Sequence, residues 1–422
     1  MKYQFALVWL VVVVVVLIDA FLLWRWKKSK GFKSPASRMF ALSFFGLLPL
    51  TAIIGFIYTG LRMPQTDGAQ IYRDFGWFLF FFLLVYLSKF LFSGFHGLQL
   101  VVNRLWPKRE EKVHHYPRMS RRKFLSQVGI VMATAPFVSL LFGAFKGRYA
   151  FYTRHVTLSF PNLPAGFDGL RIAQISDLHI GSFGDRREPL KEAIALINAE
   201  QPDLLLFTGD LVNNFAAEVR GWESVFAPLK APMGKYAILG NHDYGNYSRW
   251  PSESKKAANF RGITDGYRRL GFQLLRNKGL VLSRNGDRIG LAGVENWGTA
   301  SFPQTGDEQL AARGLEALNF RILLSHDPDH WDHKIRPQGI FDLTLSGHTH
   351  GMQFGIEKGD FRWSPAQYVQ KRWAGLYQEG KQFLYVNRGL GYHGLPARVG
   401  MPPEITIITL RRGPLGSVVK EA

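Results

Sequence analysis

An uninterrupted apolar stretch near the N-terminus limits the possible folds of this chain more than any other feature. Residues Tyr3 to Trp24 include six consecutive valines, Val11 to Val16, and a single charged side chain, Asp19. The stretch is long enough to cross the roughly 30 Å hydrocarbon core of a bilayer as a helix. Because backbone N–H and C=O groups must be paired internally within lipid, it predicts a transmembrane α-helix.

Three further apolar stretches follow in the first third of the chain. They run from Met39 to Leu61, from Phe75 to about Val102, and from Phe124 to Phe145. The last is less apolar and contains Pro136, so an amphipathic or core helix is its alternative interpretation. We predict an all-α transmembrane region over residues 1–146, with about four helices at residues 3–24, 39–61, 75–102 and 124–145.

The positive charge of the chain is concentrated in this apolar third. Residues 1–146 carry 19 Lys and Arg against 5 Asp and Glu, whereas residues 147–422 carry 33 against 27. Basic side chains fill the loops at 25–38 and 103–123, which are therefore expected to face the cytoplasm. Four spans then place both termini, and everything after Lys146, on the outer side of a bacterial inner or cell membrane. The bilayer, and not nucleic acid, is the partner that this charge pattern predicts.

Two finer expectations concern charged residues in this region. Asp19 and Lys89 both lie within apolar stretches, where charges are costly, so they are expected to pair inside the bundle. The segment from Ser120 to Leu125 contains two arginines before an apolar stretch and is similar to a twin-arginine export signal. A basic flank of a membrane helix is the alternative.

From about Arg154 onward, short apolar stretches alternate with segments of helical spacing, which predicts an α/β domain over residues 147–422. Strands are expected at residues 155–160, 170–175, 203–207, 236–239, 272–275, 280–282, 289–294, 321–324, 341–345, 382–386 and 404–410. Helices are expected at residues 189–198, 217–229 and 255–270. The stretch from Phe354 to Tyr377 is expected to be a loop.

Five of the expected strands end in a cluster of Asp, Asn or His. The clusters are Asp177 with His179, Asp210, Asn241 to Asp243, His326, and His348 with His350. Side chains converge on ligands at strand carboxyl ends in α/β folds, so one site is expected. A single residue between two ligands on extended backbone would direct both to one face, and neighbouring glycines allow close approach of the backbone.

The residue types in these clusters favour a metal site. The chain has no cysteine, which excludes thiolate ligands. Carboxylate, imidazole and amide ligands suit Mn²⁺, Fe or Zn²⁺. The clusters offer more ligands than one ion needs, so two ions bridged by a shared carboxylate fit better. His330 and His333 are interpreted as polar loop residues and not as a further metal site.

In order along the chain, the clusters read D-x-H, G-D, G-N-H-D, H and G-H-x-H. This set resembles the calcineurin-like metallophosphoesterase superfamily over roughly residues 155–412. It looks like the membrane-associated bacterial branch, which includes phosphodiesterases and hydrolases of UDP-diacylglucosamine. The resemblance implies a metallophosphoesterase β-sandwich of two mixed sheets flanked by helices, with two divalent metal ions as cofactors.

The resemblance also implies a role for each cluster residue. Seven residues would bind the two ions: Asp177, His179 and His350 the first, Asn241, His326 and His348 the second, and Asp210 as the bridge between them. A water or hydroxide between the ions would attack phosphorus in line. His242 would protonate or stabilise the leaving oxygen, and Asp243 would set the tautomer of His242. Capping of the turn is the alternative role for Asp243.

Three features could shape a substrate site. Met352 stands where many relatives carry glycine, so its side chain could narrow the substrate mouth. Arg388 follows a strand at the expected site, where it could contact a phosphate or form a structural ion pair. The stretch from Phe354 to Tyr377 mixes basic and aromatic residues, which suits either a membrane interface or a hydrophobic cover over the sheet.

These observations predict a membrane-anchored, dinuclear metal-dependent phosphoesterase of the phosphodiesterase type. It would hydrolyse a phosphodiester or pyrophosphate bond in an amphiphilic lipid or cell-envelope substrate. Two alternatives stay open at this point. One is a cytoplasm-facing pyrophosphatase of the UDP-diacylglucosamine type. The other is a non-catalytic membrane scaffold that binds phosphorylated ligands.

Overall fold

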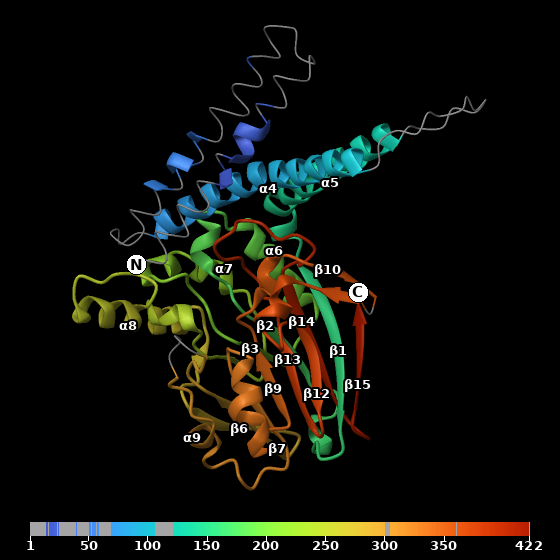
Figure 1. Cartoon of the computed structure of the whole chain (residues 1–422). Coiled ribbons are helices and arrows are strands. Elements are labelled where there is room, and N and C mark those ends of the chain that lie inside the picture. The colour runs from blue at the N-terminus through green and yellow to red at the C-terminus, as the bar shows by residue number, and fades with distance from the viewer. Residues whose placement is uncertain are drawn as a thin grey trace. The chain divides into compact units, whose positions relative to one another are not determined.

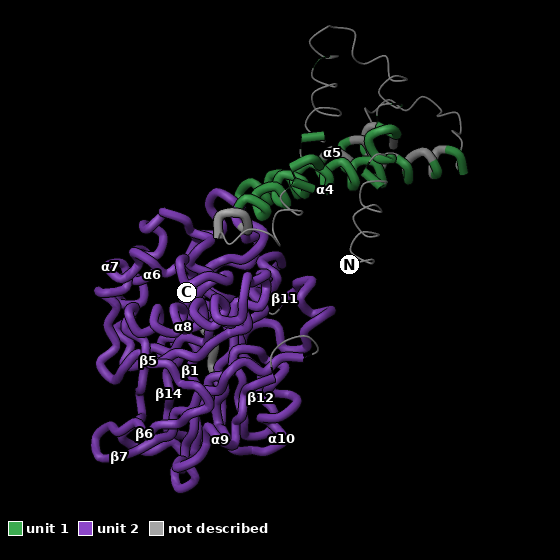
Figure 2. Tube along the Cα trace, turned by 90° about the vertical axis from the view of Figure 1, so that its left-hand side faces the viewer, with its two compact units in different colours: residues 1–63, 74–142 green, residues 64–73, 143–422 purple. Residues whose placement is uncertain are grey.

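The computed structural model describes residues 69–105, 121–299, 304–359 and 361–421, together with scattered positions between residues 14 and 58. The chain divides into two compact units, which Figure 2 shows in different colours. One comprises residues 1–63 and 74–142, and the other comprises residues 64–73 and 143–422.

The described part of the first unit is helical. α4 (Ala69–Leu105) covers the expected third span and extends beyond both of its ends, and α5 (Arg121–Phe145) covers the expected fourth span and begins three residues before it. Among the described helices, one is long and apolar enough to cross a membrane, namely residues Arg73–Phe95 of α4. The expected spans at 3–24 and 39–61 lie largely outside the described residues.

The expected pairing of Asp19 with Lys89 is confirmed. Lys89 Nζ lies 2.7 Å from Asp19 Oδ1, and the Tyr86 hydroxyl donates to Asp19 Oδ2 at 2.9 Å. The Lys89 side chain is buried. The two opposite charges neutralise each other within an apolar helical region, which reduces the cost of placing either one there.

The second unit is built on two mixed β-sheets, which confirms the expected two-sheet architecture (Figure 1). The seven-stranded sheet has the order β15-β1-β14-β2-β3-β4-β5, and the six-stranded sheet has the order β12-β13-β9-β8-β7-β6. The strands of the first sheet are β1 (Tyr152–Phe160), β2 (Arg171–Ile175), β3 (Leu204–Phe207), β4 (Lys235–Ala237), β5 (Gln273–Leu274), β14 (Glu404–Arg412) and β15 (Gly416–Glu421). Those of the second are β6 (Lys278–Arg284), β7 (Asp287–Gly293), β8 (Arg321–Leu324), β9 (Leu343–Ser346), β12 (Gly375–Glu379) and β13 (Gln382–Val386). β10 (Ile356–Lys358) and β11 (Phe361–Trp363) form a separate hairpin.

Parallel pairing within each sheet gathers the strand ends that carry the polar clusters. β2 to β5 are parallel to one another in the first sheet, and β7, β8, β9 and β13 are parallel to one another in the second. Polar clusters follow β2, β3 and β4 in the first sheet and β8 and β9 in the second. Because parallel strands end at the same edge of a sheet, each sheet brings its own clusters together.

Strand β3 shows how the core is divided. All four of its residues, Leu204 to Phe207, are buried. Leu204 and Leu206 belong to the apolar cluster between the two sheets, whereas Leu205 and Phe207 pack against helices on the outer face of the first sheet. Successive side chains of a strand point to opposite faces, so a fully apolar strand marks a sheet covered on both sides.

Helices cover the outer faces of both sheets. α6 (Glu188–Ala199) and α8 (Glu253–Arg269) pack on the first sheet, and α9 (Glu308–Ala312) packs on the second together with the π-helical turn η8 (Trp331–Ile335). α10 (Arg336–Gln338) continues η8. The short 3-10 turns are η3 (Gly147–Tyr149), η4 (Ala165–Phe167), η5 (Ile180–Phe183), η6 (Ala216–Val219), η7 (Asn241–Tyr244), η9 (His350–Gln353) and η10 (Pro365–Tyr368).

Three expectations about secondary structure are wrong. The expected helix at 217–229 is split into η6 and the short α7 (Glu223–Phe226), because Gly221 between them adopts a left-handed conformation with φ of 75°. The expected loop at 354–377 contains the β10–β11 hairpin and the start of β12. β15 follows the strand that was expected to be the last, and it pairs antiparallel with β1 at the edge of the first sheet.

Candidate metal centre

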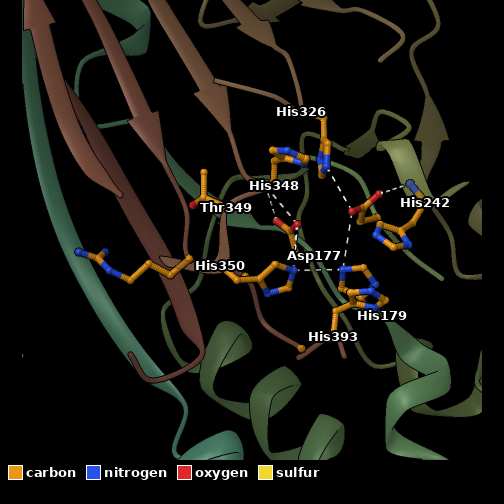
Figure 3. A network of polar contacts seen from close by, with 12 residues as sticks. Asp177, His179, His242, His326, His348, Thr349, His350 and His393 are labelled. Carbon is orange, nitrogen blue, oxygen red and sulfur yellow. Dashed lines mark hydrogen bonds and ion pairs between the residues drawn. The ribbon is translucent and has the colours of Figure 1, made fainter. Parts of the chain in front are cut away.

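The five polar clusters come together at the strand ends of the two sheets (Figure 3). Asp177 and His179 follow β2, Asp210 follows β3, and residues 241–243 lie in η7 beyond β4. His326 follows β8, and His348 and His350 follow β9. In Figure 3, Asp177 lies centrally, with His326 and His348 on one side of it and His179, His242 and His393 grouped on the other.

The backbone turns sharply where the predicted ligands lie. Of ten described non-glycine residues with positive φ, five are predicted ligands: Asp177, His179, Asp210, His348 and His350, with φ between 43° and 72°. Such conformations cost free energy, and they concentrate where function requires a fixed side-chain direction. The expectation that the D-x-H and H-x-H pairs lie on extended backbone is therefore wrong, because all four residues occupy left-handed turns.

Two glycines allow the clusters to approach one another. A Cβ atom at Gly347 would lie 1.8 Å from Ser176 Oγ, and one at Gly240 would lie 2.2 Å from Asp210 Oδ1. Both distances are far below van der Waals contact, so only glycine fits. The turns after β9 and β4 can therefore pack directly against the ligands that follow β2 and β3.

The first group of ligand atoms consists of Asp177, His179 and His350. The Nε2 atoms of His179 and His350 are 3.1 Å apart, and His350 Nε2 is 3.3 Å from Asp177 Oδ1. Burial lowers the pKa of both imidazoles well below the usual value. Both rings are therefore neutral, which is the form of histidine that binds a metal.

The second group consists of Asn241, His326 and His348. Asn241 Oδ1 lies 3.1 Å from His326 Nε2 and 2.9 Å from His348 Nδ1. The Asn241 amide donates to the Tyr247 hydroxyl at 2.6 Å, which turns its oxygen toward the two rings. The Thr208 carbonyl accepts from His326 Nδ1 at 2.7 Å, and this bond holds one proton on Nδ1, so that a metal would replace only the proton on Nε2.

Asp210 lies between the two groups. Its Oδ2 atom is 3.6 Å from His179 Nε2 and 3.3 Å from His326 Nε2. Its Oδ1 atom accepts from the backbone N–H of His242 at 2.9 Å, which fixes the direction of the carboxylate. This is the position that a bridging ligand requires.

The pKa values of the buried charged groups indicate that the centre favours a bound cation. Burial raises the pKa of the Asp177 carboxyl above its usual value. Burial also opposes ionisation of Asp210, but the neighbouring His326 and His242 outweigh it and hold the pKa of Asp210 well below its usual value. Burial would lower the pKa of His326, yet the Asp210 and Asp177 carboxylates raise it to about 10. Positive charge beside Asp210 is thus strongly favoured, and a metal ion would supply it in place of the proton.

The donor set fits two divalent cations. Ligand atoms of Asp177, His179 and His350 lie within 4.8 Å of one another, and so do those of Asp177, Asp210 and His326. Arg398 Nη2 donates to His350 Nδ1 at 3.1 Å, which places the ring proton of His350 on Nε2, where it is shared with His179 Nε2. A cation bound by both Nε2 atoms would take the place of that proton. Carboxylate, imidazole and amide ligands without thiolate suit Mn²⁺, Fe or Zn²⁺.

The predicted link between Asp243 and His242 is wrong. His242 Nδ1 donates to the backbone carbonyl of Asn213 at 2.7 Å, so this carbonyl sets the tautomer and leaves Nε2 unprotonated in the neutral ring. The Asp243 carboxylate instead accepts from the backbone N–H groups of Gly240, Asp210 and Leu211 at 2.9 to 3.0 Å, and from the Tyr267 hydroxyl at 2.8 Å. Asp243 therefore joins the turns after β3 and β4, which agrees with the turn-capping alternative.

His393 is a site residue that the sequence analysis missed. Its ring centre lies 4.3 Å from that of His242 and 4.8 Å from that of His179, and atoms of these three rings form a further group of potential ligands. His393 Nδ1 contacts Asn213 Oδ1 at 2.9 Å. Asn213 thus holds both rings, His242 through its backbone carbonyl and His393 through its side chain. A signal was present, because His393 lies in the glycine-rich segment that follows the buried strand β13.

Buried side chains keep Asn213 and the segment of His393 in place. Glu218 accepts from the backbone N–H of Asn213 at 2.8 Å and from its side-chain amide at 3.1 Å. Arg398 donates to the carbonyls of Arg388, Gly391 and Met401, and so braces the segment on both sides of His393. Asp327 was also missed, and its Oδ2 atom lies 3.8 Å from His348 Nε2.

The two residues proposed for substrate binding have different surroundings. Arg388 is buried, and its guanidinium is paired with Glu404 and, at 2.9 Å, with Glu357. Its proposed contact with a substrate phosphate is therefore wrong, and the structural ion pair is correct. Met352 is 45% exposed, two residues beyond His350. Its predicted place at the substrate mouth stays a prediction.

Comparisons with known proteins agree with this centre. The family model described as calcineurin-like phosphoesterase matches residues 170–352. A second model, described as the transmembrane domain of a probable calcineurin-like phosphoesterase, matches residues 3–148.

Three curated relatives are similar to the chain over most of their own length. The uncharacterized metallophosphoesterase YkuE of Bacillus subtilis is 33% identical, over 70% of this chain and 98% of its own. The UDP-2,3-diacylglucosamine pyrophosphatase LpxG of Chlamydia trachomatis is 30% identical, over 58% of this chain and 86% of its own. The phosphodiesterase YaeI of Escherichia coli is 28% identical, over 69% of this chain and 99% of its own.

Proposed function

Because the chain belongs to the calcineurin-like metallophosphoesterases, we propose that it is a membrane-anchored, two-metal hydrolase of a phosphodiester or pyrophosphate bond. The observation that carries the proposal is the position of Asp210 between two groups of buried ligand atoms. The Asp210 carboxylate faces an imidazole of each group, so one carboxylate could contact an ion in both.

We assign the first ion to Asp177, His179 and His350 and the second to Asn241, His326 and His348, with Asp210 bridging. When bound, the two ions supply Lewis acidity and activate water for attack on phosphorus. The metal pair of the proposal is Mn²⁺, Fe or Zn²⁺. The left-handed turns fix the ligand directions before any ion arrives, so little reorganisation accompanies binding.

Beside the ions, His242 donates a proton to the leaving oxygen. The Asn213 carbonyl holds the proton on Nδ1, so Nε2 is the atom that gains a proton from solvent and donates it to the leaving group. His393 packs against His242 and is held in the same tautomer by the Asn213 side chain. We assign His393 to the same side of the substrate, where it contacts the leaving oxygen or the group attached to it.

An amphiphilic envelope compound is the substrate class that we propose. The match of residues 3–148 to a transmembrane family model supports an enzyme that is bound to a membrane. One relative is named for a pyrophosphatase activity on a diacylated nucleotide sugar. The basic loops at 25–38 and 103–123 favour an outward-facing catalytic domain on four spans. The alternative is a cytoplasm-facing enzyme, and a topology reporter fused to the C-terminus distinguishes the two.

The test uses the full chain, purified in detergent and stripped of metal. We expect it to hydrolyse bis-p-nitrophenyl phosphate when about two equivalents of Mn²⁺ are returned per chain. Absence of turnover with both ions bound would contradict the enzymatic proposal and favour the phosphate-binding scaffold. Purified protein would then be offered envelope phospholipids and UDP-linked lipids, and the product identified by mass spectrometry.

A further inference from the structure

The exposed apolar side chains of the second unit are concentrated in one stretch. Among the described residues from 147 to 421, nine large hydrophobic side chains are exposed, and six of them lie between Met352 and Val369. The other three, Tyr247, Val281 and Leu310, lie apart from one another in the sequence. Scattered exposed apolar residues need no explanation, but a concentration of this kind marks an interaction surface.

The β10–β11 hairpin directs its apolar residues to one face. Ile356 pairs with Trp363, and Lys358 pairs with Phe361, across the two strands. Residues directly opposite in an antiparallel pair point to the same side, so these four side chains share a face. Ile356 is 55% exposed and Phe361 is 60% exposed.

Neighbouring rings extend this face. The Phe354 and Trp363 rings lie 6.2 Å apart, and Trp363 Nε1 approaches the Tyr368 hydroxyl at 3.4 Å. Tyr368 is 74% exposed and Val369 is 66% exposed. We name the set the hairpin face: Phe354, Ile356, Lys358, Phe361, Trp363, Tyr368 and Val369.

The opposite side of the hairpin is anchored in the domain. Glu357 pairs with Arg154 at 3.0 Å and with Arg388 at 2.9 Å. Arg362 donates to the Ala374 carbonyl at 3.0 Å, and behind the hairpin Trp373 packs with Ala366 and Met401. Of the two interpretations of this stretch, the hydrophobic cover applies only to the inner residues. Six of the seven side chains of the hairpin face are exposed and Trp363 is half-buried, so the described part of the second unit leaves most of this face uncovered.

The hairpin is also joined to the turn that carries the metal ligands after β9. The Ser364 hydroxyl donates to the Gly351 carbonyl at 2.7 Å, and the Thr349 hydroxyl donates to the Trp373 carbonyl. Thr349 and Gly351 flank His350 in the sequence. A surface that holds the hairpin face therefore also fixes the position of the metal centre relative to that surface.

We propose that the hairpin face docks on the surface of a lipid bilayer that contains anionic lipid. Phe, Trp and Tyr rings suit the headgroup region, and the exposed basic side chains Lys358, on the hairpin face, and Lys371 suit anionic headgroups. A second copy of the chain is a poorer occupant, since a symmetric contact would bring these cations against one another. Docking keeps the metal centre at headgroup depth, where the phosphate of an amphiphilic substrate lies. Only the placement of the metal centre near a substrate phosphate rests on the proposed function; the docking itself does not.

Fluorescent labelling tests the docking directly. The chain has no cysteine, so an introduced cysteine is its only thiol. Full chains carrying Phe361→Cys or Tyr368→Cys would be labelled with an NBD fluorophore and reconstituted into vesicles of phosphatidylcholine and phosphatidylglycerol. Val281→Cys, an apolar position of β6 that is 41% exposed, is the matched control. Phosphatidylcholine with brominated acyl chains is expected to quench the first two labels and not the control.

Two further results bear on the inference. Neutralising Lys358 with Lys358→Gln is expected to lower the ratio of docked to undocked protein about fivefold in anionic vesicles. Labels at 361 and 368 that are as exposed to water as the label at 281 would overturn the inference. So would labels that are shielded equally in detergent and in vesicles and escape quenching by brominated lipid, because protein would then cover the face.

A functional comparison separates docking from chemistry. Phe361→Glu is expected to hydrolyse bis-p-nitrophenyl phosphate at the wild-type rate but to turn over a vesicle-embedded phosphodiester lipid roughly tenfold more slowly. Equal rates on both substrates would overturn the inference and leave the proposed function intact. Failure of the wild type on the soluble substrate would instead refute the proposed function, while the quenching results would still decide the docking.

Discussion

Two buried clusters of charged residues lie in the same domain, and they are built in different ways. In the metal centre, His179 Nε2 faces His350 Nε2 at 3.1 Å and Asp210 Oδ2 at 3.6 Å, so three potential ligand atoms converge on one space. In the second cluster, Arg388 meets Glu404 and Glu357, and Arg154 meets Glu357, so that each guanidinium faces a carboxylate. Bound cations would complete the first arrangement, whereas in the second every charge already has a partner of opposite sign.

The difference separates a functional site from a structural one without reference to motifs. A buried charge is stable when its partner is of opposite sign and hydrogen-bonded to it. Glu404 meets this condition, since Tyr385 and Thr406 also donate to its Oε1 atom. In the metal centre, several imidazole and carboxylate atoms share one space without a fixed pairing of one charge with another, and a bound cation would complete this arrangement. The predictions below test this distinction, beginning with the largest expected effect.

Removing the bridging charge should abolish activity. We expect Asp210→Asn to lower kcat/KM for bis-p-nitrophenyl phosphate by at least about 10³-fold, because an amide does not neutralise two ions. Metal analysis after gel filtration should show fewer than two ions per chain. Asp265→Asn, on the exposed surface of α8, is the control and should retain both. Wild-type activity in Asp210→Asn would show that the centre is not the active site.

Breaking the second cluster should affect stability and not chemistry. Glu404→Leu leaves Arg388 buried beside a single carboxylate, and we expect a loss of roughly 3–5 kcal/mol in the free energy of unfolding. The double variant Arg388→Met with Glu404→Leu should recover part of that loss, since no uncompensated charge remains at this pair. Thermal unfolding followed by circular dichroism measures both. Lower turnover per folded, metal-loaded molecule would contradict a purely structural role.

Asp243 lies beside the metal centre, but its carboxylate, like that of Glu404, accepts hydrogen bonds on both oxygens from several donors within the domain. We expect Asp243→Asn to cost roughly 1–3 kcal/mol of stability, because one amide NH₂ would face backbone N–H donors. Tyr267→Phe, which removes one donor to the same carboxylate, should cost about 1 kcal/mol. Chemical denaturation of both variants gives the values. An Asp243→Asn variant of wild-type stability with greatly reduced kcat would restore the tautomer role that the sequence suggested.

The sequence was enough to find the candidate metal ligands but not the residues that pair with them and with the structural charges. Metal ligands must come from a few residue types close to strand ends, so order and spacing were enough to propose Asp177, Asp210 and His326 as candidates, and the structure brings them together. Hydrogen-bond partners that are distant in the sequence could not be identified in this way. The sequence places Asp243 next to His242, whereas the carbonyl that holds His242 belongs to Asn213, which is 29 residues away.

The same limit explains the errors in the fold and at Arg388. An arginine after a strand can face a ligand or an acid, and only the tertiary structure shows that Glu404 and Glu357 surround this one. The β10–β11 hairpin was expected to be a loop because its strands have three residues each, too few for a period of two to be recognised.

His393 should matter less than a metal ligand and more than a surface residue. We expect His393→Ala to lower kcat about tenfold to 100-fold with metal content unchanged, since the ring supports the substrate side of the centre without being assigned to an ion. Asn213→Ala, which removes the partner of His393 Nδ1, should act in the same direction. Loss of bound metal in His393→Ala would instead assign the ring to the ligand set.

The smallest effect is expected at a histidine–carboxylate contact outside the metal centre. His330 was interpreted as a polar loop residue, which is wrong because it is buried against the Trp297 ring. Its Nδ1 atom contacts the Ser325 hydroxyl at 2.9 Å and its Nε2 atom contacts Glu308 at 3.1 Å, so a neutral ring satisfies both partners. This contact is complete in the same sense as the Arg388 cluster.

The pH dependence of stability tests that statement. Burial favours the neutral acid, but the hydrogen bonds from His330 and Gln338 outweigh it and lower the pKa of Glu308 to about 2. An unfolded glutamate has a pKa of about 4.3. The contribution of Glu308 is therefore fully present above about pH 4.3 and is lost as the pH falls toward 2. In Glu308→Gln, thermal unfolding should depend less on pH in this window, while hydrolysis at neutral pH is unchanged. An unaltered pH dependence would mean that the fold does not stabilise Glu308 as a carboxylate. A full set of hydrogen-bond partners would then not be enough to identify a charged residue as structural.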